Sequence, residues 1–201
     1  AMEEYDRQAA KEQAKWLWHN AKLANHQHPY LVKKFVFAHG LRQNKQGSLL
    51  VPVCYEGELV NLQQINVQGE KRFLAGGQVK GCYSPIGRID TRKPLYICEG
   101  WATGATLHQQ TTSAIACALN AGNLKEVALA FRARYGDSLE IIIAGDDDRK
   151  NPNNAGRKAA NDAALAIGAL AIFPEWPSHA PIELSDFNDL ALWQMQQGAS
   201  A

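Results

Sequence analysis

The sequence predicts an α/β protein in which a parallel, doubly wound sheet follows a smaller α+β part. From Lys93 onward, short apolar runs alternate with helix-compatible segments, the pattern of strands joined by right-handed helical crossovers. Residues 48–74 instead carry short β-type runs separated by glycine turns. With 46% hydrophobic residues, the 201-residue chain can bury a hydrophobic core. We therefore expect two domains, residues 1–92 and residues 93–201.

The N-terminal part is predicted to be one long helix followed by a small antiparallel sheet. Residues 3–25 are rich in Ala, Lys, Glu and Gln and contain no Gly or Pro, which indicates a helix. Strands are expected at 48–55, 59–67 and 71–74, with glycine-containing turns between them.

The C-terminal part is predicted to be a short parallel sheet flanked by helices. Its expected strands cover residues 95–98, 114–117, 139–144 and 169–173, and its expected helices begin near residues 103, 124 and 154. In sheets of this kind, ligands bind beyond the carboxyl ends of the strands.

The two halves of the sequence differ in charge. Residues 1–92 contain 13 basic and 8 acidic residues, a net charge of +5, whereas residues 93–201 contain 8 and 12, a net charge of −4. This division suits a protein that binds phosphates with its basic part and metal ions with its acidic part.

Composition also limits the class of protein. The four cysteines are widely spaced without a CxxC pair, so buried thiols are favoured over a zinc ribbon or a disulfide framework. No apolar run is long enough to span a membrane, and the first residues are acidic, unlike a signal peptide. We expect a cytoplasmic protein without a membrane partner.

Acidic residues follow two of the predicted strands of the C-terminal part. Glu99 comes directly after the first strand, and Asp146, Asp147 and Asp148 follow the third. Because alternate residues of an extended segment share a face, Asp146 and Asp148 can point together toward Glu99 while Asp147 points elsewhere. Three crowded carboxylates favour a hard cation with oxygen ligands, here Mg²⁺ or Mn²⁺. Such a site suits nucleotidyl transfer or nuclease chemistry.

An alternative interpretation gives the aspartate run a structural role. The three aspartates could form a solvated loop that caps the helix beginning near Asn154. The presence of Glu99 at the end of an earlier strand disfavours this interpretation.

The sequence resembles a known family in two ways. A Glu-Gly pair after one strand and an Asp-x-Asp after a later strand resemble the Toprim domain of bacterial-type primases, topoisomerases and some nucleases. Several longer segments are similar to Toprim-domain DNA primases of phages, satellite phages and conjugative plasmids. These segments are His28-Pro29-Tyr30-Leu31, Leu50-Val51-Pro52-Val53, Lys71-Arg72-Phe73-Leu74, Cys98-Glu99-Gly100-Trp101-Ala102-Thr103-Gly104, Ala121-Gly122-Asn123-Leu124 and Asp186-Phe187-Asn188-Asp189-Leu190.

The resemblance implies roles for particular residues. Glu99, Asp146 and Asp148 would bind the catalytic metal, and the later acidic motif would add Asp186, with Asn188 matching less securely. The basic subdomain before the sheet would hold template, nucleotide or primer. Lys71 and Arg72 are the first candidates for this role.

The sequence also departs from the family pattern. Thr103 stands where the replicative bacterial primase has an acid, although the phage and plasmid branch has this form. The loop over residues 149–157 is longer than that of the replicative enzyme. The sequence contains neither a zinc-binding module nor a GxxxxGK[ST] helicase motif. Both an excised primase core and a naturally small protein fit these features.

Other residues are candidates with an equally ordinary alternative. Lys33, Lys34, Arg42, Lys80 and Arg88 could extend a track for template phosphates, or could be surface charges. Arg157 could bind a nucleotide phosphate at a helix N-terminus, or Asn153 or Asn154 could simply cap that helix. Trp101 could stack on a base, although packing in the core is favoured over stacking.

The expected function is a DNA primase core that synthesises short RNA primers on single-stranded DNA by Mg²⁺-dependent nucleotidyl transfer. Its expected partners are the template, ribonucleoside triphosphates and a replicative helicase or fused helicase domain, and its site would lie in a cleft between the two domains. The alternatives are a metal-dependent nuclease, in which the same carboxylates direct water at phosphorus, and a noncatalytic nucleic-acid-binding module. A topoisomerase would need a nucleophilic tyrosine, which nothing in the sequence identifies.

Overall fold

The computed structural model describes residues 1–199 and divides the chain into two compact units, residues 1–84 and residues 85–201. The sequence placed the domain boundary at residue 92. The division falls earlier because strand β6 (Ser84–Ile86) already belongs to the sheet of the second unit.

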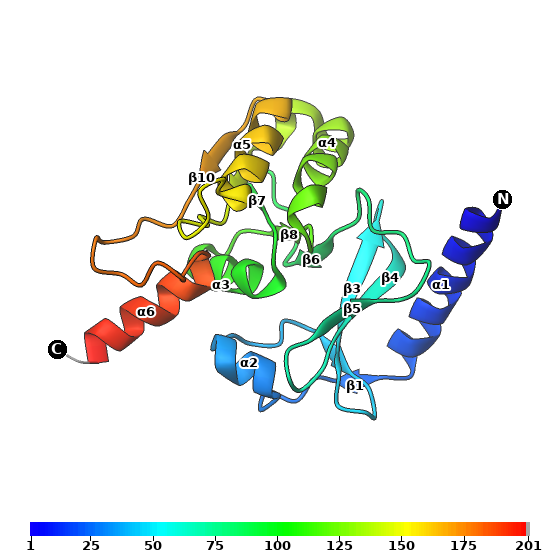
Figure 1. Cartoon of the computed structure of the whole chain (residues 1–201). Coiled ribbons are helices and arrows are strands. Elements are labelled where there is room, and N and C mark those ends of the chain that lie inside the picture. The colour runs from blue at the N-terminus through cyan, green and yellow to red at the C-terminus, as the bar shows by residue number, and fades with distance from the viewer. Residues whose placement is uncertain (200–201) are drawn as a thin grey trace. The chain divides into compact units, whose positions relative to one another are not determined.

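The first unit is an antiparallel sheet with two helices (Figure 1). Its strands follow one another in the order of the sequence: β1 (Lys22–Leu23), β2 (Arg42–Gln43), β3 (Leu49–Tyr55), β4 (Glu58–Ile65) and β5 (Lys71–Phe73). Helix α1 (Met2–His19) packs on β4, and its Ala14 forms a buried cluster with Leu50 and Leu62. The predicted small antiparallel unit is confirmed.

Helix α1 is shorter than the sequence predicted. It ends at His19 rather than residue 25, and the backbone N–H of Asn20 donates to the Trp16 carbonyl 3.1 Å away. The following residues pair as β1 with β2, so strand pairing overrides the helix propensity of this Ala- and Lys-containing segment.

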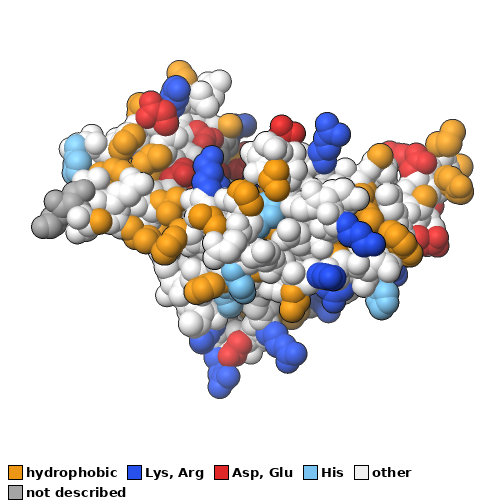
Figure 2. Space-filling model, turned by 90° about the horizontal axis from the view of Figure 1, so that it is seen from below, with side chains coloured by type: hydrophobic (Ala, Val, Ile, Leu, Met, Phe, Trp, Pro, Cys, Tyr) orange, Lys and Arg blue, Asp and Glu red, His pale blue; other side chains and the backbone are white. Residues whose placement is uncertain are grey.

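A second short helix of the first unit was not predicted. Helix α2 (Pro29–Lys34) has Pro29 in its first turn, and the His28 ring nitrogen accepts a bond from the Tyr30 N–H. Figure 2, seen from below, shows basic, histidine and hydrophobic side chains exposed on the face that it presents.

The second unit contains a five-stranded sheet in the order β10-β9-β7-β8-β6. Besides β6, its strands are β7 (Leu95–Cys98), β8 (Ile115–Cys117), β9 (Ile141–Ala144) and β10 (Leu170–Ile172). These four pair in parallel. The helices are α3 (Trp101–Thr111), α4 (Leu124–Tyr135), α5 (Ala155–Ile167) and α6 (Phe187–Ala199), with short 3-10 turns at η1 (Ala121–Asn123) and η2 (Gly136–Ser138).

The helices cover the sheet in two layers. Helices α4 and α5 pack together against the central strands, while α3 packs on β7 and β8 and against α6. Figure 1 shows the strands between these two groups of helices. Gly104 of α3 allows a close approach, because an added Cβ would lie 2.3 Å from the Cys117 sulfur. The predicted α/β fold, with a parallel sheet after a smaller α+β part, is confirmed.

Two further expectations concern cysteines and membranes. The four cysteines are free; Cys98, Cys117 and Cys82 are buried, and Cys54 is half-buried. Among residues 1–199, no helix combines the length and apolar character that crossing a membrane requires.

Candidate metal centre and phosphate-binding residues

The predicted acidic residues lie at one edge of the parallel sheet. Strands β7 and β9 are neighbours, and their last residues, Cys98 and Ala144, face each other in the register. Glu99 follows directly after β7, and Asp146 and Asp148 follow after β9. The carboxyl ends of both strands therefore present carboxylates at the same edge.

The segment before α6 reaches the same edge. The Asp147 backbone N–H donates to the Ser185 carbonyl at 2.8 Å, which fixes the chain just before Asp186 beside the aspartate run. Asp186 and Asp189 form a reciprocal N-terminal cap: the Asp189 N–H donates to Asp186 Oδ1 at 2.7 Å, and the Asp186 N–H donates to Asp189 Oδ2 at 3.2 Å. The cap orients the Asp186 carboxyl group.

The carboxyl group of Asp146, at this edge of the sheet, has a strongly raised pKa. Burial and the negative charges of Glu99 and Asp186 raise the pKa of Asp146 to about 9, with smaller contributions from a hydrogen bond to Glu99 and the charge of Asp148. Asp146 Oδ1 is buried without a hydrogen-bond partner. A buried oxygen without a donor, surrounded by like charges, is an environment that a bound cation would stabilise.

Asp148 is held by the beginning of helix α5. The Gly156 N–H donates to Asp148 Oδ2 at 2.8 Å, so the positive end of the helix faces this carboxylate. A Cβ at Gly156 would lie 2.8 Å from Asp148 Oδ2 and 2.9 Å from the Asp146 carbonyl oxygen. Only glycine fits this approach between helix and loop.

Asp147 has structural partners at the beginning of helix α5. Arg157 Nη2 lies 3.2 Å from Asp147 Oδ2, Arg157 Nε donates to Oδ1 at 3.3 Å, and Asn154 Nδ2 donates to Oδ1 at 2.6 Å. Burial raises the pKa of Asp147, but the bonds from Arg157 and Asn154 outweigh it, so the pKa lies below its ordinary value. The sequence had assigned Asp147 no part in the metal site, and in the structure its carboxylate contacts Asn154 and Arg157.

The Arg157 side chain, near the N-terminus of α5, contacts both Asp147 and Phe173. Its guanidinium carbon lies 4.0 Å from the Phe173 ring centroid, and Asn154 caps α5 by accepting the Arg157 backbone N–H. From the sequence, phosphate binding by Arg157 and capping by Asn153 or Asn154 were equally favoured. In the structure, Asn154 caps α5, and the Arg157 side chain forms an ion pair with Asp147.

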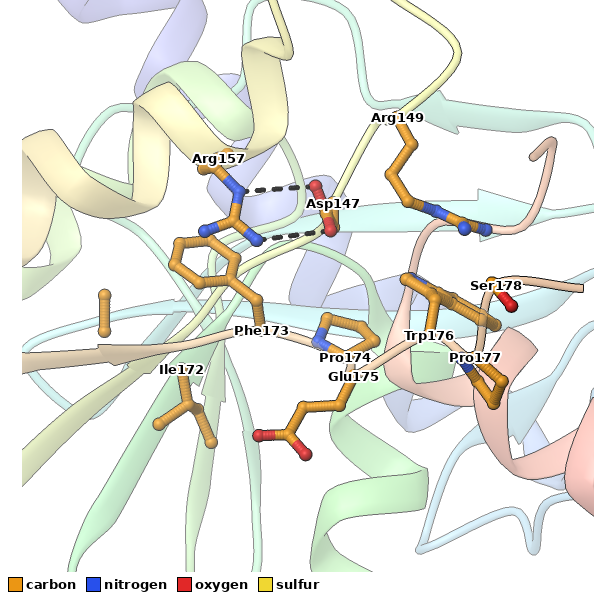
Figure 3. Close-up of a pocket in the computed structure, with 11 residues that line it drawn as sticks. Asp147, Arg149, Arg157, Ile172, Phe173, Pro174, Glu175, Trp176, Pro177 and Ser178 are labelled. Carbon is orange, nitrogen blue, oxygen red and sulfur yellow. Dashed lines mark hydrogen bonds and ion pairs between the residues drawn. The ribbon is translucent and has the colours of Figure 1, made fainter. Parts of the chain in front are cut away.

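A pocket of about 550 Å³ is lined by Asp147, Arg149 and Arg157 together with residues of the segment after β10. Figure 3 shows the Arg157–Phe173 stack at one side and Arg149 above Trp176 at the other. The Arg149 guanidinium carbon lies 4.7 Å from the Trp176 ring centroid, and Arg149 Nη2 donates to the Pro181 carbonyl at 2.8 Å. These contacts fix the loop after β10 against the aspartate loop.

The carboxylates fit a divalent cation in their chemistry. Glu99, Asp146, Asp148 and Asp186 offer only oxygen ligands, the set that Mg²⁺ prefers. Among residues 1–199, no three His, Cys, Asp or Glu side chains already form a group that could hold an ion. The carboxyl groups of Glu99, Asp148 and Asp186 nevertheless lie close enough to Asp146 to raise its pKa.

Two residues near the acidic motifs have packing roles. Trp101, directly after the motif glutamate and glycine, is 1% exposed, so it packs in the core rather than stacking on a base. Asn188 is also buried, and its Nδ2 donates to Thr106 Oγ1 of α3 at 2.9 Å. This bond fastens α6 to α3, a function that the family motif alone did not indicate.

The basic candidates of the first unit separate into two groups. Lys34 and Lys71, from α2 and β5, both lie over the Tyr30 ring, with Nζ to centroid distances of 5.9 and 5.7 Å. Arg42 instead packs on Trp18, with Nη1 donating to the Trp18 carbonyl at 2.6 Å. The structure therefore brings together two of the predicted phosphate-binding lysines and gives Arg42 a partner in the fold.

The remaining basic candidates are at the surface. Arg72 follows Lys71 on β5, and both side chains are exposed; Lys33 and Lys80 are exposed as well. Because neighbours on a strand point to opposite faces, Lys71 and Arg72 extend from opposite faces of β5.

A parallel sheet with a glutamate after one strand and an Asp-x-Asp after its neighbour defines the class of domain. The family described as "Toprim domain" matches residues 94–198, more than half of the 201 residues, and the chain belongs to this family. The resemblance stated from the motifs is thereby confirmed.

The relatives are primases. Two Escherichia coli proteins named "DNA primase TraC" are 37% and 36% identical to this chain over 156 residues. Each alignment covers 73% of this chain, but it covers only 11% and 15% of the two relatives. The chain therefore spans a small part of the length of these relatives.

A solved structure shares the fold. It is described as bacteriophage T7 lagging-strand DNA polymerase interacting with primase domains of two gp4 subunits bound to an RNA/DNA hybrid and dTTP. The matched chain has a TM-score of 0.56 at 16% identity, with 90% of both chains covered. At this identity, the likeness supports the fold.

Proposed function

We propose that this chain is the catalytic core of a DNA primase, joining ribonucleotides into a short RNA primer on single-stranded DNA. The observation that carries the proposal is the meeting of Glu99, Asp146, Asp148 and Asp186 at the carboxyl edge of a Toprim sheet. The similarity of this part of the chain to proteins named DNA primase supports the choice of reaction.

The four carboxylates would hold one or two Mg²⁺ ions. Bound Mg²⁺ would neutralise phosphate charge and polarise the reacting oxygens. Asp146 would be the central ligand, because its buried Oδ1 has no other partner. Asp148 would be held in position by the Gly156 N–H, and Asp147 would fix the loop through Arg157.

The proposed reaction is a balanced substitution at phosphorus. The 3′-hydroxyl oxygen of the growing strand forms a bond to the α-phosphorus of a ribonucleoside triphosphate. The bond from that phosphorus to the bridging oxygen breaks, pyrophosphate leaves, and the hydroxyl proton passes to solvent. Because charge gathers on the phosphate oxygens, correctly placed positive charge accelerates the step.

The basic first unit would bind the template and the nucleotides. Lys71 and Arg72 are the first candidates for phosphate contacts, with Lys34 beside Lys71 over Tyr30. Phosphate contacts from lysine and arginine give most nonspecific affinity for nucleic acid. A helicase, separate or in the same protein, would be the expected partner of such a primase.

The test is incorporation of labelled ribonucleotides on single-stranded DNA with Mg²⁺. The wild-type chain should make short RNA, and Asp146→Ala should make none while keeping its circular dichroism spectrum. The matched control is Asp162→Ala, an exposed aspartate of α5 that pairs only loosely with Lys158 at 3.9 Å. Unchanged product from Asp146→Ala would refute the assignment, and shortening of the template without RNA product would favour a nuclease.

A further inference from the structure

The end of helix α2 carries a phenylalanine where the local backbone favours glycine. The Val36 N–H donates to the Leu31 carbonyl at 3.2 Å, and the Phe35 N–H donates to the Val32 carbonyl at 3.1 Å, the pair of bonds of a Schellman motif. Phe35 takes the left-handed position of this motif, with φ 53° and ψ 51°. Glycine is the usual residue there, because a side chain in this conformation is strained.

Burial does not explain the phenylalanine either. The Phe35 residue is 64% exposed, and Phe37, two residues later, is 65% exposed. A hydrophobic ring that neither fits its backbone position nor packs in the core has no role in folding that the structure reveals. Residues that keep an unfavourable backbone conformation cluster at functional sites, which makes Phe35 a candidate for binding.

The surroundings of these rings are basic. Lys33 and Lys34 precede Phe35 in α2, and the Lys71 ammonium lies over the Tyr30 ring of the same helix. No acidic residue occurs between Glu12 and Glu56, an interval that contains six Lys and Arg.

One acidic residue, Glu70, lies next to Lys71 in the sequence. Glu70 accepts a hydrogen bond from Asn66 Nδ2 at 3.2 Å in its own turn. With Lys33, Lys34 and Lys71 against this one acid, the surface has a net positive charge and is complementary to a polyanion.

We propose that Lys33, Lys34, Phe35, Phe37 and Lys71, here called the α2 patch, bind single-stranded DNA, with the two phenylalanine rings stacking on bases and the lysines contacting phosphates. Exposed aromatic rings between cations are the combination that holds single strands without sequence preference. The proposal rests on the proposed function, because it names how the first unit holds the template.

The test measures binding separately from synthesis. Fluorescence anisotropy of a labelled oligothymidylate reports the Kd of the full chain for a single strand. Phe35→Gly should raise the Kd about 10-fold, the loss expected of one stacked base. Because glycine suits the left-handed position, the same variant should melt at the wild-type Tm or above it. A loss of binding with an unchanged or higher Tm distinguishes a ligand contact from a structural role.

A matched control comes from another exposed aromatic residue of the first unit. Tyr5 is 74% exposed on α1, but it lies among the acidic residues Glu3, Glu4 and Asp6. Tyr5→Ala should bind the oligonucleotide like the wild type. Phe35→Gly with Phe37→Ser should lose more affinity than either single variant. Lys34→Ala with Lys71→Ala should weaken the dependence of the Kd on salt.

The outcomes separate this proposal from the proposed function. If Asp146→Ala binds single strands normally and Phe35→Gly does not, the α2 patch is supported, even when the wild type incorporates no nucleotide. Wild-type affinity of Phe35→Gly would overturn the proposal. So would a concentration-dependent dimer that dissociates in Phe35→Gly while strand binding is kept, because a second copy of the chain would then be the occupant of the patch.

Discussion

Replacing Asp146 by asparagine should stabilise the protein without metal at neutral and alkaline pH, although it removes the central ligand of the candidate metal centre. In the wild type, burial and then the charges of Glu99 and Asp186 raise the pKa of Asp146 from 3.8 to about 9. Folding therefore opposes ionisation of this group. Asparagine has nearly the same shape and cannot ionise, so the variant does not have the free-energy cost of an ionised group at this position in the folded state.

The sign and the size follow from linkage between proton binding and folding. A carboxyl group whose pKa is raised on folding favours the folded state fully below its unfolded pKa, and this contribution is lost as the pH rises toward its folded pKa. At pH 7 the stabilisation lost cannot exceed the value set by the difference between pH 7 and the unfolded pKa of 3.8. At about 1.4 kcal/mol for each pH unit, this gives roughly 4 kcal/mol as an upper value, and we expect about 2 to 4 kcal/mol.

The assay is urea denaturation of both proteins in a chelating buffer at several pH values between 4 and 8.5. The free energies of unfolding should agree near pH 4 and diverge in favour of Asp146→Asn as the pH rises. Addition of Mg²⁺ should then stabilise the wild type and have much less effect on the variant. A pH-independent difference, or a variant that is less stable at pH 8, would refute the reasoning.

The neighbouring aspartate provides a control of opposite sign. The contacts of Asp147 with Arg157 and Asn154 lower its pKa despite its burial, so its ionised form favours the folded state. That contribution is present above its unfolded pKa and is lost as the pH falls. Asp147→Asn should therefore destabilise the protein at pH 8, where Asp146→Asn stabilises it.

Three further substitutions test the packing of the site. Gly156→Ala would place a Cβ 2.8 Å from Asp148 Oδ2, so primer synthesis should fall about tenfold or more, and unfolding should cost about 1 to 3 kcal/mol less. Arg157→Met would leave the buried Asp147 carboxylate without its ion-pair partner. It should lower the free energy of unfolding by about 1 to 3 kcal/mol, less than for a fully buried pair because the Arg157 side chain is 44% exposed. Gly104→Ala should lower the Tm although alanine favours helices, because the new Cβ would collide with a buried sulfur.

Each of these substitutions has a matched control in the same unit. Gly198→Ala lies in helix α6, where nothing lies within 4 Å of the added Cβ, and it should leave the Tm unchanged or raise it. Lys158→Met removes an exposed cation next to Arg157 and should change the free energy of unfolding by less than about 0.5 kcal/mol. Equal effects of a test substitution and its control would contradict the packing described for the site.

The sequence predicted the central strands well because their residues are apolar and bounded by turns. The strand Leu95–Cys98 matches its predicted range, and the strand Ile141–Ala144 lies inside the range 139–144 that was predicted for it. The end of helix α1 was predicted wrongly, because the pairing of Lys22 with Gln43 depends on a segment twenty residues away. A local pattern contains no information about such a partner.

In the candidate site, too, features set by local sequence could be predicted, and features that depend on distant partners could not. The convergence of Glu99 and Asp146 followed from two strand ends and the geometry of parallel sheets. The partner of Asp147 could not be found in this way, since it depends on Asn154 and Arg157 folding back from the next helix. The exposure of Phe35 was equally hidden, because a phenylalanine beside apolar residues ordinarily indicates a core position.

The loop between the aspartate run and helix α5 is tied at its base. Asn154 Oδ1 accepts the Asp148 N–H at 2.8 Å, and its Nδ2 bonds to Asp147, so the chain leaves and returns at nearly the same point. Residues 150–153, which lie between, are exposed. Lengthening a closed surface excursion costs little chain entropy. The length of this segment can therefore vary without moving the carboxylates, which makes it a place where related proteins can acquire inserts and where a peptide tag can be introduced.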